Sequence, residues 1–400
     1  MPWSETSPMD QRRAFLWECE QQWWSMTELC ARYGISRKTG YLWLGRQARG
    51  EGVDERSRRP HHCPHAIAEP IVERILGFRR AHRRWGPKKI RQELQRRDPQ
   101  TRWPARSTIS LVLKRNGLVT AARRRVRPGH PGRPLTPIDA ANAVWSIDFK
   151  GHFRTGDGQV CYPLTVTDGF SRFLLACDAF AHPTTGATRR TLERVFREYG
   201  LPAVLRSDNG APFAGTGLAR LSRLAVWWIR LGIRPELIEP ASPQQNGRHE
   251  RMHRTLKADT AQPAAPSRAA QARRFHRFRT GYNFARPHEG IGLAYPSTLY
   301  VPSSRPFPSS LPEVVYPGAW TPRHVYGCGE IDWRGHRVWV SRVLAGETIA
   351  LDECAEGYWS VYFGPVLIGV LDERRRRIRP KPLVAKVTEG ARVLTHARAE

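Results

Sequence analysis

A chain of 400 residues with 40% hydrophobic residues and 14 tryptophans can bury several cores, which excludes a wholly disordered protein and predicts two to four domains. Its 65 Lys and Arg against 36 Asp and Glu leave a formal charge of +29, which predicts a polyanionic partner, and the preference for Arg favours nucleic acid. The N-terminus lacks a secretory signal pattern and arginines interrupt the most apolar stretch, so we expect a cytoplasmic protein without a membrane segment.

The cysteines give no support for a metal or disulfide framework. The seven of them show no C-x-x-C pair and no regular spacing, so we interpret them as reduced thiols. A local cluster, His61, His62, Cys63 and His65, is not followed by a second Cys or His pair at ligand spacing. A zinc site is therefore not predicted there.

Residues 1–60 are predicted to form a helix-turn-helix DNA-binding domain. Apolar side chains recur at helical spacing, Gly34 stands where a left-handed residue ends a helix, and Ser36 can cap a third helix. The first turn of such a third helix meets base edges in the major groove, which nominates Arg37, Lys38 and Thr39 for DNA contact. Leu42 and Leu44 are expected in the core. A three-helix bundle that binds nothing would share this pattern, but the net charge favours DNA.

Residues 61–122 are predicted to form a second helix-turn-helix domain. Two periodic helices flank a Trp-Gly-Pro break, and a third helix is expected to begin at an N-cap, Ser107, and to end at the pair Asn116-Gly117. Neither helical domain holds an enzymatic constellation. Two successive units indicate an extended DNA site rather than a single half-site.

Three further segments complete the predicted organisation. Residues 123–139 combine arginines with Pro and Gly and lack periodicity, which is typical of a linker. Residues 140–305 alternate strands and helices, so an α/β domain is expected. Residues 315–400 hold short apolar and aromatic runs at regular spacing, which predict a small β-barrel that binds DNA and ends in a basic tail. The arginine run of that tail could equally be a solvated face.

The chemistry is expected in residues 140–305. Phosphoryl transfer by two metal ions needs carboxylates that lie on rigid elements, far apart in sequence and close in space. Asp148 lies in VWSIDFKG, a predicted apolar strand where an ionised carboxylate is costly unless it binds a cation or is fully hydrogen-bonded. Asp208 directly follows the strand AVLRS, where α/β sheets place ligand groups, although Asp-Asn-Gly is also ordinary turn chemistry.

Glu250 is the third candidate carboxylate. It begins a predicted helix just after the break Asn246-Gly247, and Arg254 and Lys257 lie on the same face of that helix. The carboxylate can therefore take metal while the two cations approach DNA phosphates. An exposed glutamate with two ion-pair partners is the plainer alternative.

Two other glutamates also follow Asp208 at a suitable distance. Glu236 and Glu239 lie in LGIRPELIEPASP, where the prolines predict strand and loop. Neither glutamate is then held on a rigid helix that faces two strand aspartates, so Glu250 is preferred.

A family resemblance rests on three segments in a fixed order. WSIDFKG, RSDNGAPF and SPQQNGRHERMHRTLK resemble the catalytic core of bacterial insertion-sequence transposases related to retroviral integrases, and the paired helical units with WGPKKIRQEL are similar to the family's N-terminal half. The resemblance implies a ribonuclease-H-like mixed sheet flanked by helices. It also implies that Asp148, Asp208 and Glu250 are the catalytic, metal-binding triad.

The chemistry that the resemblance implies is DNA strand cleavage and strand transfer with Mg²⁺ or Mn²⁺, as two ions. Water attacks a phosphodiester at the element end, and the freed 3′-hydroxyl then attacks target DNA without a covalent enzyme intermediate. The implied partners are the terminal inverted repeats and target DNA, bound by several copies of the chain in a bacterial nucleoid. No nucleotide cofactor is expected, because the sequence has no G-x-x-x-x-G-K phosphate loop.

One interval of the sequence departs from the family pattern, and two alternative functions share some of its features. The 41 residues between Asp208 and Glu250 exceed the usual interval, which implies an insertion or a long helix in GLARLSRLAVWWIRLG. A catalytically inactive helix-turn-helix regulator derived from a transposase is one alternative, although the intact carboxylates argue against it. A ribonuclease H acting on hybrids is the other, and it gives no reason for two helix-turn-helix units.

Overall fold

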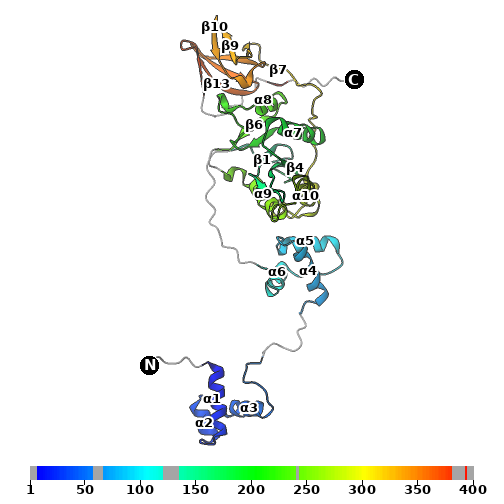
Figure 1. Cartoon of the computed structure of the whole chain (residues 1–400), viewed down its shortest axis with the longest axis vertical. Helices are drawn as coiled ribbons and strands as arrows, with labels where there is room; N and C mark the ends of the chain where they lie inside the picture. Colours follow the sequence, from blue (N-terminus) through cyan, green and yellow to red (C-terminus); the bar gives the residue numbers. More distant parts are fainter. Residues whose placement is uncertain (1–6, 57–65, 120–134, 240–242, 381–391, 394–400) are drawn as a thin grey trace. The chain divides into compact units, whose positions relative to one another are not determined.

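The structure is a computed structural model that describes residues 7–56, 66–119, 135–239, 243–380 and 392–393 (Figure 1). By their contacts the residues fall into two compact units, 1–68 and 69–400. None of the helices in the described ranges is long and apolar enough to span a membrane. The cluster at residues 61–65 and most of the predicted linker lie outside the described residues.

The first unit contains three helices, as predicted: α1 (Pro8–Glu20), α2 (Met26–Arg32) and α3 (Arg37–Ala48). A serine caps each of them, and Ser36 accepts the Thr39 N–H at the start of α3. Gly34 has a φ of +62°, the left-handed conformation that ends α2. The buried core consists of Phe15, Leu16, Leu29, Cys30 and Trp43.

The prediction that Leu42 is a core residue is wrong. Its side chain is 51% exposed, whereas the neighbouring Trp43 is buried and Leu44 packs partly against the same core. The reason is the phase of α3, which turns Gly40 and Trp43 inward, and these are three residues apart on one helix face.

A second group of three helices follows: α4 (Glu69–Ala81), α5 (Pro87–Arg97) and α6 (Arg106–Arg115). The predicted N-cap at Ser107 is wrong, because α6 already begins at Arg106 with Ala105 as its cap residue and no side-chain cap bond. The predicted end is confirmed: Asn116 is the C-cap and Gly117 has a φ of +67°. The helices pack through Ile75, Ile90, Leu94 and Ile109, which are all fully buried.

The predicted mixed sheet is confirmed in the central part of the chain. Its strands are β1 (Val144–Phe149), β2 (Phe153–Arg154), β3 (Val160–Asp168), β4 (Leu174–Phe180), β5 (Val204–Ser207) and β6 (Arg234–Leu237). Strands β1, β3 and β4 pair antiparallel, and β5 and β6 then continue the sheet parallel to β1. Three antiparallel strands extended by two parallel ones fit the ribonuclease-H-like core that the motifs imply.

Helices cover both faces of this sheet. On one face α7 (Thr185–Tyr199) and α8 (Arg223–Arg230) pack against Leu164 and Val166 of β3. On the other face α9 (Gly247–Thr260) and α10 (Arg268–Thr280) pack with Cys161 of β3 and with β4. Because side chains alternate along a strand, Thr165 and Thr167 also face α9.

The long helix that the wide interval before Glu250 implied is not formed. The interval holds a 3-10 turn η1 (Leu218–Arg220), the eight-residue α8, strand β6 and a second turn η2 (Pro243–Asn246). Helix α8 buries Trp227 and Trp228, and its Arg230 pairs with Glu347 at 2.9 Å. The tryptophan-rich segment therefore joins the six-stranded sheet to the C-terminal strands.

The C-terminal strands are β8 (Thr321–His324), β9 (Glu330–Trp333), β10 (His336–Trp339), β11 (Thr348–Ala355), β12 (Tyr358–Phe363), β13 (Val366–Asp372) and β14 (Arg377–Arg379). Strands β9 to β13 coincide with the predicted apolar and aromatic runs, whereas β8 and β14 were not predicted. Five of them form one antiparallel sheet and β9 pairs with β10 in a hairpin, so closure into a barrel stays a prediction. Shorter elements are α11 (Pro296–Leu299), β7 (Val314–Val315), β15 (Arg392–Val393), the π-turn η3 (Gly281–Ala285) and the 3-10 turns η4 (Glu289–Ile291) and η5 (Arg342–Leu344).

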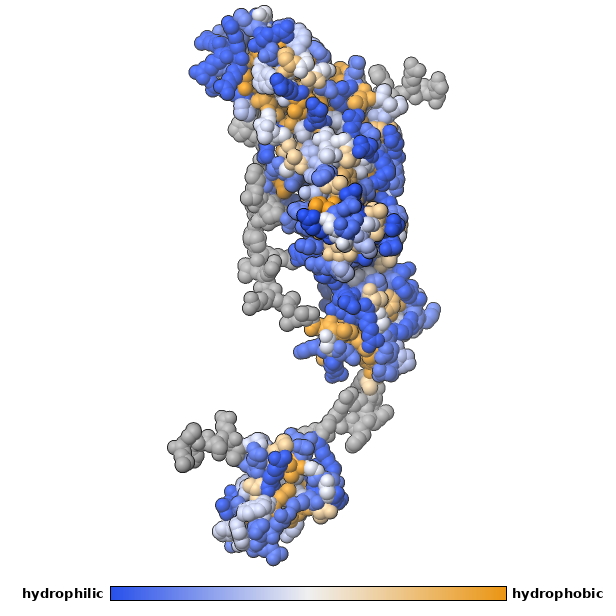
Figure 2. Space-filling view, in the orientation of Figure 1, coloured by the Kyte–Doolittle hydropathy of each residue, from blue (hydrophilic) through white to orange (hydrophobic). Residues whose placement is uncertain are grey.

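The arginine run near the end is not a tail where the structure describes it. Residues 373–376 form the turn after β13, and Arg377–Arg379 is strand β14, which pairs with β13. Asp372 lies 3.8 Å from Arg375 and 3.7 Å from Arg379, so the run is partly neutralised within its own hairpin. Figure 2 shows that the visible surface is predominantly hydrophilic, with smaller apolar areas among the hydrophilic ones.

Candidate active site

Asp148 and Asp208 are brought together by the pairing of two parallel strands. Val144, Trp145 and Ser146 of β1 lie opposite Val204, Leu205 and Arg206 of β5. The same register continued by two residues places Asp208, directly after β5, beside Asp148. Both aspartates therefore lie at the carboxyl ends of adjacent parallel strands, where α/β sheets gather ligand groups.

The electrostatics of Asp148 reflect this crowding of carboxylates. Burial, together with the neighbouring Asp208 carboxylate and a smaller contribution from Glu250, raises the pKa of Asp148 to about 7, although Lys150 opposes the shift. A buried carboxylate that is surrounded by other carboxylates is stabilised when a cation joins them.

The loop that carries Asp208 is fixed by its own hydrogen bonds. The Gly210 N–H donates to Asp208 Oδ1 at 3.1 Å, and Asn209 Nδ2 donates to the Ile238 carbonyl at 2.6 Å. Arg220 Nη1 donates to Asn209 Oδ1 at 2.9 Å. The loop after β5 thus forms the predicted turn, and Asp208 within it stands where a metal ligand was predicted.

Helix α9 carries Glu250 in its first turn, as predicted. Glu250, Arg254 and Lys257 are all exposed, whereas the opposite side of the helix buries His249, Met252, His253, Leu256 and Thr260. The exposed face thus combines one carboxylate near Asp148 with two cations in the following turns. The negative group lies at the helix N-terminus, where the helix dipole favours it.

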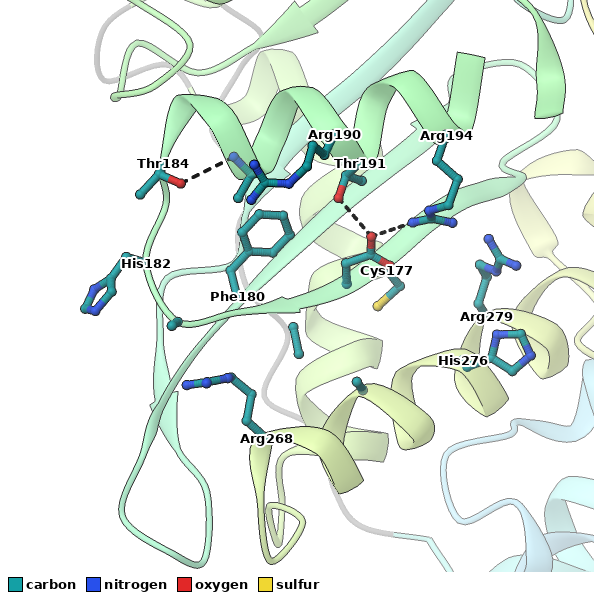
Figure 3. A pocket seen from close by; sticks show the side chains of 15 residues that line it. Cys177, Phe180, His182, Thr184, Arg190, Thr191, Arg194, Arg268, His276 and Arg279 are labelled. Atoms are coloured by element: carbon teal, nitrogen blue, oxygen red, sulfur yellow. Dashed lines mark hydrogen bonds and ion pairs between the residues drawn. The ribbon is translucent and has the colours of Figure 1, made fainter. Parts of the chain in front are cut away.

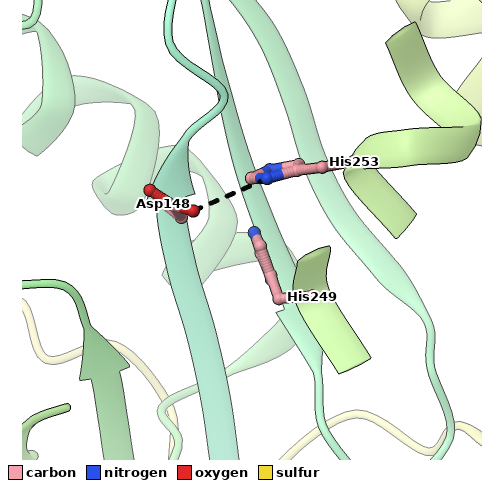
Figure 4. Close-up of side chains that lie close together, drawn as sticks. All are labelled: Asp148, His249 and His253. Carbon is pink, nitrogen blue, oxygen red and sulfur yellow. Dashed lines mark ion pairs between the residues drawn. The ribbon is translucent and has the colours of Figure 1, made fainter. Parts of the chain in front are cut away.

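The sequence interpretation missed two buried histidines on α9. His249 and His253 point from the helix toward the strand that carries Asp148 (Figure 4). His253 Nδ1 lies 3.5 Å from Asp148 Oδ2, and both imidazoles contact the Thr165 hydroxyl, at 2.8 Å from His249 Nε2 and 2.6 Å from His253 Nε2. Burial lowers the pKa of His249 to about 3 and that of His253 far below its ordinary value, so both are neutral.

These histidines had a signal in the sequence. His249 and His253 form an H-E-x-x-H pattern around Glu250, and this spacing places two imidazoles on one helix face. Among the described residues, one ligand atom from each of Asp148, His249 and His253 lies within 4.8 Å of the others. The Thr165 and Thr167 hydroxyls already engage both nitrogens of His249, at 2.8 Å each, so His249 is the less available ligand.

The alternative glutamate Glu236 has a different environment. It lies on β6, as the prolines predicted, and its Oε2 is 2.7 Å from Arg206 Nε of β5. Thr136 donates its N–H to Glu236 Oε1 at 3.0 Å. The Glu236 carboxylate therefore forms a structural ion pair with Arg206.

The predicted DNA-contact residues of the first unit are accessible. Arg37 and Lys38 are exposed on the first turn of α3, and Thr39 is half-buried with its hydroxyl 2.9 Å from that of Ser36. Trp17, Trp23 and Trp24 of the same unit are also exposed, at 53%, 62% and 48%. This unit therefore presents cations and aromatic rings to solvent.

A basic groove lies at the β4 edge of the sheet, between α7 and α10 (Figure 3). Its volume is about 700 Å³, and its charged lining comprises one acid, Asp178, and the basic residues Arg190, Arg194, Arg268 and Arg279. Arg194 is paired with Asp178 and Arg279 donates to the Leu175 carbonyl at 2.8 Å. None of the three candidate carboxylates lines this groove.

Protein-family models match the central and N-terminal parts of the chain. Residues 139–243 and 231–296 each match a family described as integrase core domain, and residues 11–81 match one described as the leucine-zipper of insertion element IS481. The matched core spans Asp148, Asp208 and Glu250.

Individual relatives agree with these families. The chain is 27% identical over 250 residues to an uncharacterised protein of insertion element IS407 from Burkholderia multivorans, a match that covers 60% of this chain and 82% of that protein. It is 32% identical over 142 residues to the Gag-Pol polyprotein of baboon endogenous virus, covering 35% of this chain and only 7% of the polyprotein.

Two solved structures show distant likeness. The magnesium complex of the HTLV-2 integrase catalytic core domain is 14% identical with a TM-score of 0.33, and the match covers 40% of this chain and 98% of that domain. The simian T-cell lymphotropic virus intasome in complex with the PP2A regulatory subunit B56 gamma is 17% identical with a TM-score of 0.36, covering 62% and 89%.

Proposed function

We propose that this chain, which matches the integrase core domain family, is a bacterial insertion-sequence transposase that binds the ends of its mobile element and catalyses metal-dependent DNA strand cleavage and strand transfer. The observation that carries the proposal is the meeting of Asp148 and Asp208 at adjacent strand ends, with the Glu250 charge acting on Asp148. Three carboxylates, from strand β1, the loop after β5 and helix α9, form the donor set that divalent cations prefer.

The donor set fits Mg²⁺ or Mn²⁺. Asp148, Asp208 and Glu250 supply oxygen ligands only, and the buried Asp148 carries a charge that lacks full compensation within the protein. Two ions bound there would activate the attacking oxygen and stabilise the leaving oxygen of an in-line displacement. The protein's own contribution is to hold the carboxylates rigidly on β1, the loop after β5 and α9.

The cations around the site are suited to the DNA backbone. Arg254 and Lys257 follow Glu250 on the exposed face of α9, so phosphates held by them would lie next to the carboxylates. Lys150, two residues after Asp148, adds a third positive charge to the same region. Contacts of this kind fix the register of the DNA without reading its sequence.

Recognition of the element ends is assigned to the two helical groups. Exposed Arg37 and Lys38 on α3, together with Thr39, are placed to read bases, and the C-terminal strands are proposed to close into a small DNA-binding barrel. We further propose that several copies of the chain assemble on the ends, because cutting and joining two ends requires more than one active site.

Strand transfer of a pre-cut element end into plasmid DNA, assayed with Mg²⁺, tests the proposal. Asp148→Asn and Asp208→Asn should each abolish joining and leave end binding intact, because the amide is nearly isosteric but neutral. Joining at the wild-type rate by Asp148→Asn would remove this residue from the site. End binding without any joining by the wild-type protein would favour the inactive regulator instead.

A further inference from the structure

A row of polar contacts leads from β3 through α9 to Asp148, and Figure 4 draws its last part, from His249 and His253 to Asp148. Thr167 Oγ1 contacts His249 Nδ1 at 2.8 Å, His249 Nε2 contacts Thr165 Oγ1 at 2.8 Å, and Thr165 Oγ1 contacts His253 Nε2 at 2.6 Å. His253 Nδ1 then lies 3.5 Å from Asp148 Oδ2. We propose that His253, fixed by Thr165 and His249, is a positioning residue that orients the Asp148 carboxylate for its metal ion.

The direction of this row follows from the chemistry of its end. An ionised carboxylate only accepts hydrogen bonds, so with His253 Nδ1 lying 3.5 Å from Asp148 Oδ2 the favourable arrangement presents Nδ1–H to the carboxylate. A neutral imidazole has one N–H, and His253 Nε2 is therefore an acceptor for the Thr165 hydroxyl hydrogen. Thr165 then accepts from His249 Nε2–H, and His249 Nδ1 accepts from Thr167. Every hydrogen in the row points toward Asp148.

Thr165 has a second possible acceptor, and the distances decide between the two. Its hydroxyl lies 3.2 Å from the Asp148 carbonyl oxygen but only 2.6 Å from His253 Nε2. If the hydroxyl donated to the carbonyl instead, His253 would carry its proton on Nε2 and aim a lone pair at the Asp148 carboxylate. The shorter contact and this repulsion both favour donation to His253.

The position of the row allows it to affect the orientation of more than one carboxylate of the site. His249 and His253 are each 1% exposed, and they flank Glu250 on the same helix. Anchoring both imidazoles to β3 fixes the rotation of α9, and this rotation sets the direction of Glu250. One set of buried contacts thus couples two of the three carboxylates, in the manner of outer contacts that orient metal ligands.

The inference rests on the proposed function, and metal binding by the full-length protein without DNA tests it directly. Mn²⁺ affinity is measured by electron paramagnetic resonance for His253→Ala, His253→Asn and Thr165→Val. Loss of such an outer contact typically weakens metal binding about 10- to 100-fold, which we expect for His253→Ala. His253→Asn should recover part of the loss because its amide N–H can still donate to Asp148, and Thr165→Val should show a smaller loss.

A matched control separates positioning from folding. His288 is another buried imidazole, 9% exposed, and its Nε2 lies 3.0 Å from the Tyr282 carbonyl oxygen. His288→Asn should cost stability and leave Mn²⁺ affinity unchanged. Unfolding midpoints of all variants are compared, so that a metal-binding loss is scored only in folded protein.

Two results would overturn the inference. Wild-type Mn²⁺ affinity in folded His253→Ala would exclude positioning by His253. A His253→Asn protein as weak as His253→Ala, with Thr165→Val unaffected, would make His253 itself a ligand. The proposed function fails separately, if Asp148→Asn retains wild-type Mn²⁺ affinity or joins DNA.

Discussion

The Arg206 guanidinium and the Glu236 carboxylate form a buried ion pair at 2.7 Å, which joins β5 to β6 immediately before Asp208. Burial by itself would raise the pKa of Glu236, but Arg206 and the Thr136 hydrogen bonds outweigh burial and hold this pKa below its ordinary value. Glu236 is therefore part of a structural ion pair within the sheet, which supports Glu250 as the proposed third carboxylate.

The first prediction compares glutamate-to-glutamine variants in joining of a pre-cut element end. Glu250→Gln should eliminate metal-dependent strand transfer, because it removes one oxygen ligand charge. Glu236→Gln should lower stability, since loss of one partner leaves Arg206 buried without its counter-charge, yet retain most activity. Glu239→Gln is the matched control on the same segment and should also remain active. An active Glu250→Gln enzyme would refute its role.

The second prediction concerns the pH dependence of the metal-free protein. The pKa of Asp148 is raised from 3.8 to about 7, so its contribution to stability is fully present below pH 3.8 and is lost as the pH rises through 7. At pH 8 the ionised, 19%-exposed carboxylate costs at most about 4 kcal/mol. In urea unfolding with a chelator, Asp148→Asn should be more stable than wild type at pH 8 and similar at pH 4.

The converse holds when metal is present. Because the cation binds the ionised form of Asp148, wild-type Mn²⁺ affinity should rise steeply from pH 6 to 8. A flat affinity over this range would show that Asp148 ionises without difficulty. As the control, Asp148→Asn, which lacks the titrating carboxyl, should bind Mn²⁺ weakly at every pH in this range.

The third prediction addresses the contact between α5 and the segment after the π-turn. Glu93 is fully buried, accepts from Arg96 and Arg97 at 2.7 Å each, and accepts from the Tyr295 hydroxyl at 2.6 Å. Burial alone would raise the pKa of Glu93, but these hydrogen bonds lower it to about 2. The stabilisation is therefore present above pH 4.5 and lost as the pH falls toward 2.

Two variants separate the parts of this contact. Glu93→Gln should lower the free energy of unfolding at pH 7 and flatten its decline in acid. Tyr295→Phe removes one hydrogen bond, about 1 kcal/mol, and should retain the acid sensitivity. Unchanged acid sensitivity in Glu93→Gln would assign the effect to other carboxyl groups.

The sequence predicted candidate site residues where a local motif marks them. Asp148 was predicted because it is a carboxylate inside an apolar strand, and Asp208 and Glu250 because each stands at the end of a strand or the start of a helix, with a recognisable motif around all three. The partners of these residues could not be predicted in the same way. Thr165 faces His253 only because β3 pairs with β1 and α9 crosses them, and no local pattern encodes this arrangement.

Errors in the prediction have the same physical origin. Leu42 and Trp43 are both apolar, and only the packing of α3 against Phe15 and Leu29 decides which one is buried. The arginine run that includes Arg377–Arg379 was interpreted as a tail because its high charge hides the alternation of exposed and buried side chains that is typical of a strand. Pairing with β13 buries Ile378 between Arg377 and Arg379, which a charge count does not reveal.

The last prediction tests whether α3 reads sequence. Arg37 and Lys38 are exposed on its first turn, so replacing both by Ala should weaken binding to the element end far more than binding to random DNA. Each bidentate base contact is worth about 1 to 3 kcal/mol, so a loss of roughly 5-fold to more than 100-fold per contact is expected on end DNA.

Arg13→Ala on α1, which replaces an exposed cation 4.0 Å from Asp10, is the control and should change both affinities little. Affinities for end and random DNA are measured by fluorescence anisotropy at two salt concentrations, because phosphate contacts depend on salt and base contacts less so. Equal losses on both DNAs, with a reduced salt dependence, would show that Arg37 and Lys38 contact only the backbone and that sequence is read elsewhere.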